Sequence, residues 1–114
     1  MGVIESAKKL SDKCDSLTKS ILMQTSLAHV TNPLNYAWDY HESYLAQYSG
    51  LGAKTLLLGM NPGPYGMAQC GVPFGATKIA KDFLKITGEF HDPEGRHPKR
   101  PIEGLNFERQ EISG

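Results

Sequence analysis

A loop rich in glycine and proline carries the side chains best suited to chemistry in this sequence. It runs from Asn61 to Gly75 and follows a short apolar run at residues 54–60. Glycine lets a backbone approach a ligand closely, and proline lowers the entropy cost of holding one loop shape. Asn61 could position a water or pair with a base edge, and Phe74 could stack on a base. A structural alternative stays open, in which the amide caps a turn and the ring fills the core.

The residues of this loop exclude two familiar kinds of phosphate-binding site. A P-loop needs a terminal Gly-Lys-Ser or Gly-Lys-Thr, and residues 59–75 contain no lysine. The glycine fingerprint of dinucleotide-binding folds fails on spacing. The loop therefore predicts a rigid pocket for a flat, polar ligand and nothing narrower.

The elements expected to position the loop form the start of a parallel α/β unit. Residues 54–60 are short, apolar and bounded by glycine, which is typical of a strand buried on both faces. A helix is expected over residues 77–86, with Gly88 as its cap. We therefore predict an α/β fold of three layers, with a central parallel sheet flanked by helices, here truncated after the first strand-loop-helix unit. Ligands bind at the carboxyl ends of strands in such sheets, where this loop would lie.

Helices are expected upstream of this unit and a surface loop downstream. Apolar residues recur at steps of three and four through the amino-terminal segment, residues 1–31, until Asn32-Pro33 interrupts the pattern. A second helix fits residues 37–47, with its aromatic residues in the core. Turn-forming and charged residues fill positions 89–114, which predict a surface loop with an incomplete end. Residues 1–114 are interpreted as one portion of a single domain.

Composition limits the partners of this chain. It has 114 residues with 12 basic and 12 acidic side chains, so nucleic-acid binding needs a local patch. Cys14 and Cys70 lack metal-like spacing and are interpreted as reduced thiols of an intracellular protein. No apolar stretch is long enough to span a bilayer. We expect a monomer with no metal, no cofactor and no membrane partner.

Residues 59–75 resemble the first catalytic motif of the single-strand-selective monofunctional uracil-DNA glycosylases. The resemblance is specific and runs from about residue 32 to the end, because three further segments match that family: Asn32 to Trp38, His97 to Pro101 and Glu111 to Gly114. Two residues depart mildly from the pattern. Tyr65 stands where Phe is expected, and Cys70 stands where Thr is expected.

The resemblance implies a DNA N-glycosylase that acts in the nucleus. Such an enzyme hydrolyses the N-glycosidic bond of uracil and of 5-substituted uracils, such as 5-hydroxymethyluracil, in single- and double-stranded DNA. It flips the nucleotide out of the stack, and water attacks the sugar through an oxocarbenium-like state, which initiates base excision repair without lyase chemistry. The implied partner is therefore DNA that contains uracil.

The resemblance also implies a role for each residue of the motif. Asn61 positions the attacking water, and Phe74 stacks on the flipped base. Met60, Gly63 and Met67 form the base pocket, where the glycine leaves room for a substituent at the 5-position. Backbone N–H groups of residues 63–67 could bond the base carbonyls. Lys99 and Arg100 either contact the phosphate backbone or are solvated cations of an exposed loop.

The family's second catalytic motif has no counterpart in these residues. That motif supplies a histidine that stabilises the leaving uracil anion, and a later strand supplies an asparagine that reads the base. The four histidines, His29, His41, His91 and His97, all lack the expected His-Pro-Ser-Pro context. We therefore expect this chain to be inactive alone. The alternative function is a catalytically inactive truncated product that at most binds DNA or a protein partner.

Overall fold

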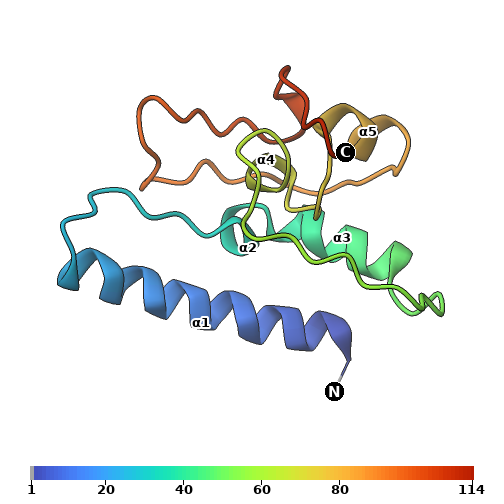
Figure 1. The fold of residues 1–114 in the computed structure, drawn as a ribbon, viewed down its shortest axis with the longest axis horizontal. Helices are drawn as coiled ribbons and strands as arrows, with labels where there is room; N and C mark the ends of the chain where they lie inside the picture. Colours follow the sequence, from blue (N-terminus) through green and yellow to red (C-terminus); the bar gives the residue numbers. More distant parts are fainter. Residues whose placement is uncertain (1) are drawn as a thin grey trace.

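The computed structural model describes residues 2–114, which form helices joined by long irregular segments (Figure 1). Helix α1 (Val3–Gln24) runs along one side of the molecule, and α2 (Pro33–Tyr36) and α3 (Trp38–Tyr48) lie against it. The rest of the chain adds α4 (Met67–Cys70), α5 (Thr77–Asp82) and a single turn of 3-10 helix, η1 (Gly104–Asn106). None of the helices among residues 2–114 combines the length and the apolar character needed to cross a bilayer.

Local sequence signals explain where the upstream helices begin. Pro33 occupies the first turn of α2, where its missing N–H costs nothing. The Asn32 side chain caps that helix by accepting a hydrogen bond of 3.1 Å from the Leu34 N–H. The α1 helix is fastened beneath it, because the buried Ser11 hydroxyl donates to the Leu34 carbonyl at 2.9 Å.

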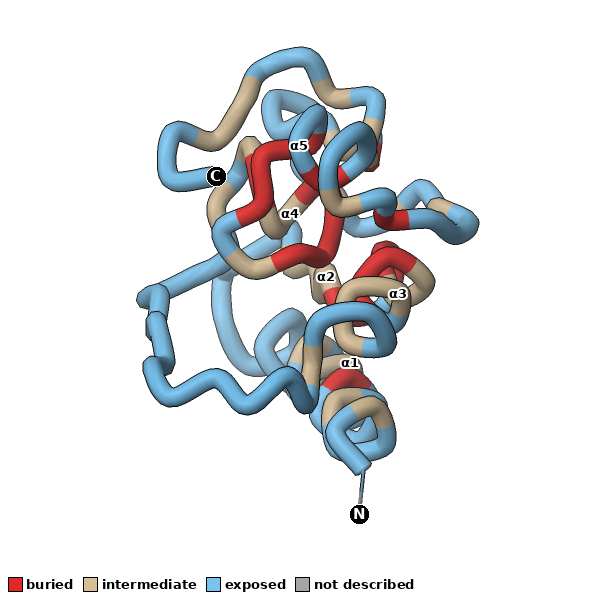
Figure 2. Tube along the Cα trace, turned by 90° about the vertical axis from the view of Figure 1, so that its right-hand side faces the viewer, coloured by how far each residue is buried: buried red, intermediate tan, exposed pale blue. Residues whose placement is uncertain are grey.

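The core lies where α3, α4 and α5 meet around α2. Figure 2 shows the buried segments gathered in that region, while α1 is buried along only a small part of its length. Aromatic rings fill part of the core. The ring of Phe90 stacks on Tyr40 with the centroids 6.3 Å apart and meets Tyr36 edge-on with the centroids 6.1 Å apart. The buried cluster consists of Tyr36, Ala37, Tyr40, Cys70, Val72, Ala80 and Ile86.

The prediction of an α/β fold with a central parallel sheet is wrong for this chain. No β-strand occurs among residues 2–114, and the predicted strand at 54–60 is an extended surface segment. Leu56 is 84% exposed, Leu58 87% and Met60 98%. A strand is stable only when a neighbouring strand pairs its backbone N–H and C=O groups. No described residue offers that pairing, so the apolar run lies against solvent. The helix predicted to reach residue 86 also ends earlier, at Asp82.

Candidate active site

An open hollow of about 610 Å³ lies beside the loop between residue 61 and residue 75. Five of the residues singled out from the sequence line it together: Met60, Asn61, Gly63, Met67 and Phe74. The remaining lining residues are Leu57, Leu58, Gly59, Pro62, Pro64, Pro73, Glu111 and Ser113. The hollow is thus mostly apolar, with one amide, one hydroxyl and one carboxylate.

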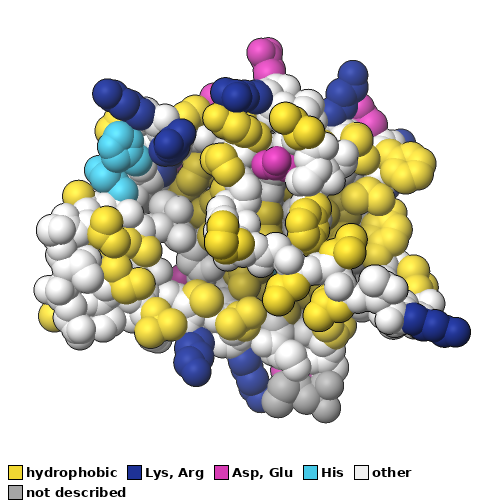
Figure 3. All heavy atoms as spheres, in the orientation of Figure 1, with side chains coloured by type: hydrophobic (Ala, Val, Ile, Leu, Met, Phe, Trp, Pro, Cys, Tyr) yellow, Lys and Arg dark blue, Asp and Glu magenta, His cyan; other side chains and the backbone are white. Residues whose placement is uncertain are grey.

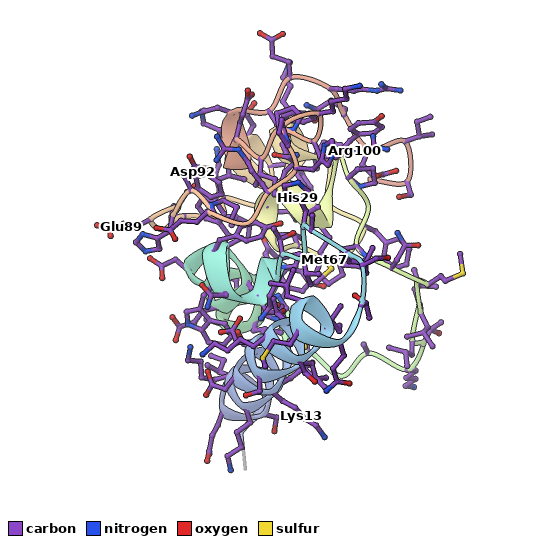
Figure 4. All side chains as sticks on the ribbon, turned by 90° about the vertical axis from the view of Figure 1, so that its left-hand side faces the viewer. Lys13, His29, Met67, Glu89, Asp92 and Arg100 are labelled. Carbon is purple, nitrogen blue, oxygen red and sulfur yellow. The ribbon has the colours of Figure 1, made fainter. Side chains whose placement is uncertain are left out.

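A turn at the start of α4 gives the loop its shape. The Gly63 carbonyl accepts hydrogen bonds from the N–H groups of Gly66, at 3.2 Å, and Ala68, at 2.9 Å. Met67 follows that turn as the first residue of α4, and Figure 4 labels its side chain. The Gly66 N–H is therefore already paired inside the loop. Among the N–H groups expected to bond a base carbonyl, this one is not free.

The buried side chain of Gln69 ties the loop to a distant segment. Its Nε2 donates to the carbonyl of Pro64 at 2.9 Å and to that of Pro101 at 2.8 Å. Its Oε1 accepts from the Glu103 N–H at 2.8 Å. One side chain therefore fixes the hollow's wall against residues 101–103.

Cys70, which departs from the family pattern, is fully buried behind the loop. Its Sγ lies 3.3 Å from the Gly66 carbonyl oxygen, within the range of a weak S–H hydrogen bond. Burial raises the pKa of this thiol to about 11, so it stays protonated at neutral pH. The thiol therefore acts as a small buried donor, and it does not line the hollow.

The α4 helix ends in a glycine that its neighbours require. Gly71 has a φ of 68°, and a Cβ placed there would lie 2.8 Å from the Ala37 carbonyl oxygen. Its own carbonyl accepts a hydrogen bond of 2.8 Å from Nδ1 of the buried His41. Burial lowers the pKa of His41, so the ring is held neutral with its proton on Nδ1. His41 therefore supports the loop from behind.

Phe74 holds a backbone conformation that is rare for a bulky residue. Its φ is 56°, in the left-handed region that favours glycine. The ring is 39% exposed and lies outside the buried cluster. It packs over Gly59, where a Cβ would lie 3.2 Å from its Cζ atom. The structure thus places this ring on the wall of the hollow, at a cost of roughly 1–2 kcal/mol in backbone strain.

Asn61 presents an amide that the rest of the chain leaves largely unused. Its Nδ2 donates only to the carbonyl of the adjacent Pro62, at 3.1 Å. Its Oδ1 accepts no hydrogen bond from residues 2–114, and the side chain is exposed. The carbonyl oxygen is therefore available to a water or a ligand at the rim of the hollow.

Glu111 is a lining residue that the sequence analysis did not single out. A Cβ on Gly63 would overlap its Oε2, and a Cβ on Gly66 would lie 3.0 Å from its Cβ and Cγ. Its side chain thus lies across two glycines of the loop. Among the described residues that line the hollow, it is the only one with an ionisable side chain. Fifty residues separate it from Asn61, and only the fold brings the two segments together.

Lys99 and Arg100 lie apart from the hollow. They belong to an exposed turn in which the Arg100 N–H donates to the His97 carbonyl at 2.9 Å. The His97 ring meets His29 edge-on at 4.8 Å, and Figure 4 labels His29 and Arg100 on this flank. Figure 3 shows histidine side chains beside basic ones at one end of the molecule. The two cations therefore form a separate, local basic surface.

Curated relatives match nearly all of this chain. It is 42% identical over 113 residues, or 99% of its length, to the single-strand selective monofunctional uracil DNA glycosylase of Bos taurus. It is 47% identical over 85 residues to the protein of that name from Rattus norvegicus, and 46% identical over 85 residues to the one from Mus musculus. By sequence, the chain is similar over most of its length to single-strand selective monofunctional uracil-DNA glycosylases. No family model matches it.

The chain spans well under half the length of these glycosylases. It covers 40% of the Bos taurus protein, 31% of the Rattus norvegicus protein and 30% of the Mus musculus protein. No histidine lines the hollow formed by the described residues. Within residues 2–114, no group of three or more His, Cys, Asp or Glu side chains is arranged to hold a metal ion.

Proposed function

We propose that this chain supplies the base pocket and the water-positioning amide of a uracil-DNA glycosylase. The reaction is hydrolysis of the N-glycosidic bond of uracil and of 5-substituted uracils in single- and double-stranded DNA, which initiates base excision repair. One observation carries the proposal: five residues chosen from the sequence, from Met60 to Phe74, line a single hollow. The names of the curated relatives support the same activity.

In this mechanism the flipped base lies against the ring of Phe74. The residue is partly exposed, and the tip of its ring lies against Gly59 on the wall of the hollow, which makes the ring a candidate stacking surface. Base stacking on an aromatic ring contributes about 1–3 kcal/mol, enough to offset the backbone strain at this residue. A glycine or asparagine would adopt this backbone more easily. A bulky ring at this strained position therefore favours a role in binding over a role in folding.

Asn61 positions the nucleophile in this mechanism. An amide does not take up a proton near neutral pH, so its role is orientation of a water toward the anomeric carbon. Bond breaking then runs ahead of attack, and the departing uracil anion needs stabilising groups. Backbone N–H groups of the loop other than that of Gly66 are candidates for this task. We propose that the protein acts as a monomer in the nucleus, with Lys99 and Arg100 meeting the phosphate backbone.

An excision assay tests the proposal. We would compare the 114-residue chain with a chimera in which it replaces the matching stretch of the Bos taurus relative. Each is incubated with a labelled single-stranded oligonucleotide that contains one uracil, and abasic sites are cleaved with alkali. The chimera should excise uracil, and Asn61→Ala should slow it by about 100- to 1000-fold. Asn106→Ala, an exposed amide outside the hollow, is the matched control.

The outcome also separates the second candidate function. An inactive chain beside an active chimera favours a catalytically inactive product that binds DNA or a partner, since no histidine of this chain lines the hollow. A chimera that folds and excises uracil equally well with Asn61→Ala contradicts the role given to the amide. A folded chimera that leaves uracil in place contradicts the proposed activity.

A further inference from the structure

Of the described residues that line the hollow, Glu111 alone has a charged side chain, and contacts on both sides of it fix its position. The side chain crosses the two glycines at 63 and 66, where a Cβ on either residue would press against it. Neither carboxylate oxygen has a hydrogen bond or an ion pair with any residue between 2 and 114. The group therefore keeps its full capacity to accept hydrogen bonds from a molecule in the hollow.

Its neighbour in the chain fixes this position. The Gln110 Oε1 accepts a hydrogen bond of 2.9 Å from the Lys78 N–H, and its Nε2 donates to the Thr77 hydroxyl at 2.9 Å. Both partners lie in the first turn of α5. After Glu111, the Gly114 N–H returns to the Glu111 carbonyl at 3.2 Å, and Gly114 packs against Ala76. The backbone on both sides of the carboxylate is thus held against the element that follows the loop.

An ionised carboxylate selects among ligands by their proton donors. It only accepts hydrogen bonds, so an N–H or O–H that faces it is favoured. A methyl group in the same place removes water from the charge without replacing the lost hydrogen bonds, which is unfavourable. The wall at Gly63 therefore discriminates by chemistry as well as by size.

We propose that Glu111 is a specificity-determining residue of this hollow. Its carboxylate accepts a hydrogen bond from a donor on the bound pyrimidine and disfavours a pyrimidine that places a methyl group there. This inference rests on the proposed function, because it assigns a ligand contact within the same site. It covers recognition of the base only and involves no covalent step.

Binding of free bases to the 114-residue chain tests the inference without requiring excision. We would titrate uracil, 5-hydroxymethyluracil and thymine, and follow the backbone amide resonances of Gly63 and Gly66 by NMR. 5-Hydroxymethyluracil and thymine both carry a carbon substituent at the 5-position, and only the former has a hydroxyl there. The chain should bind 5-hydroxymethyluracil about 10- to 100-fold more tightly than thymine, which is the factor expected for a hydrogen bond to a charged acceptor.

Variants separate the carboxylate from the rest of the wall. Glu111→Gln and Glu111→Ala should reduce the preference to about 3-fold or less, because charge assistance contributes much of such a hydrogen bond. Glu108→Gln, an exposed acid of the same segment outside the hollow, should keep it. Gly63→Ala should also reduce the preference, since its Cβ would displace the carboxylate. Adding Gly63→Ala to Glu111→Ala should not reduce the preference for 5-hydroxymethyluracil over thymine any further.

The possible results are distinct. A preference that survives unchanged in Glu111→Gln and Glu111→Ala overturns the inference and leaves the proposed function standing. A chain that binds uracil but shows no preference between the two substituted bases also overturns the inference alone. A chain whose Gly63 and Gly66 resonances respond to none of the three bases overturns both the inference and the assignment of this hollow as a base pocket.

Discussion

Gln69 provides the sharpest test of how the candidate site is held in place. The side chain is 1% exposed and makes three hydrogen bonds of 2.8–2.9 Å, to Pro64, Pro101 and Glu103. Gln69→Leu keeps a similar volume but leaves two carbonyls and one N–H without their partner. Each such hydrogen bond contributes about 0.5–1.5 kcal/mol net, so the free energy of unfolding should fall by about 2–4 kcal/mol.

Urea unfolding followed by far-UV circular dichroism measures that loss. Domains of this kind are stable by only about 5–15 kcal/mol, so the expected change is a large fraction of the total. Gln47→Leu is the matched control, because Gln47 is exposed and should shift stability by no more than about 0.5 kcal/mol. An equal urea midpoint for Gln69→Leu and the parent chain would refute the reasoning. The loop would then be held by other contacts.

Three further predictions follow from single groups. Phe74→Gly should change the free energy of unfolding by no more than about 0.5 kcal/mol, because relief of the backbone strain at a φ of 56° offsets the greater flexibility of glycine. The same change should weaken uracil binding about 10-fold in an NMR titration, because the stacking ring is lost. Because burial lowers the pKa of His41, the unfolded chain binds a proton below about pH 6.5 that the folded chain does not. The free energy of unfolding should therefore be full above about pH 6.5 and decline below it. His41→Gln should flatten that decline, measured by urea unfolding between pH 7.5 and 5.5. Cys70, with a pKa of about 11 and no exposed surface, should resist iodoacetamide at pH 8, while the partly exposed Cys14 reacts; equal labelling by mass spectrometry would contradict this.

Local signals in the sequence were enough to select residues that the structure brings together, while their roles stay predictions. Asn61 and Phe74 belong to one loop whose prolines restrict its shape and whose glycines allow close approach of a ligand, so the composition of that loop is enough to predict a pocket. The structure gathers both residues on one hollow. Of the two mild departures, Cys70 has a local role, as a buried donor toward the Gly66 carbonyl. Tyr65 instead stacks on Phe107, which is distant in the sequence, with the ring centroids 6.2 Å apart.

The fold class was predicted wrongly because it depends on contacts between distant segments and not on local signals. The run from Lys54 to Met60 has the composition of a buried strand, but burial and pairing depend on segments far away in the sequence. Among the described residues no segment pairs with it, and its leucines are exposed. A local pattern can therefore indicate that a segment prefers an extended, apolar setting. It cannot supply the neighbouring strands that make such a segment part of a sheet.

Glu111 is a second feature that local sequence patterns could not predict, in this case a candidate binding residue. The segment from Glu111 to Gly114 carries part of the family resemblance, but its residue types do not by themselves predict a binding residue. What selects it is the space above Gly63 and Gly66, and that space exists only after the chain folds. The family resemblance implies that Gly63 leaves room for a substituent on the base. The structure adds a second reason, because the same glycine admits a carboxylate. The proposed preference for a hydroxyl over a methyl group therefore depends on two segments, the loop that contains Gly63 and the segment that contains Glu111. Neither segment alone would indicate it.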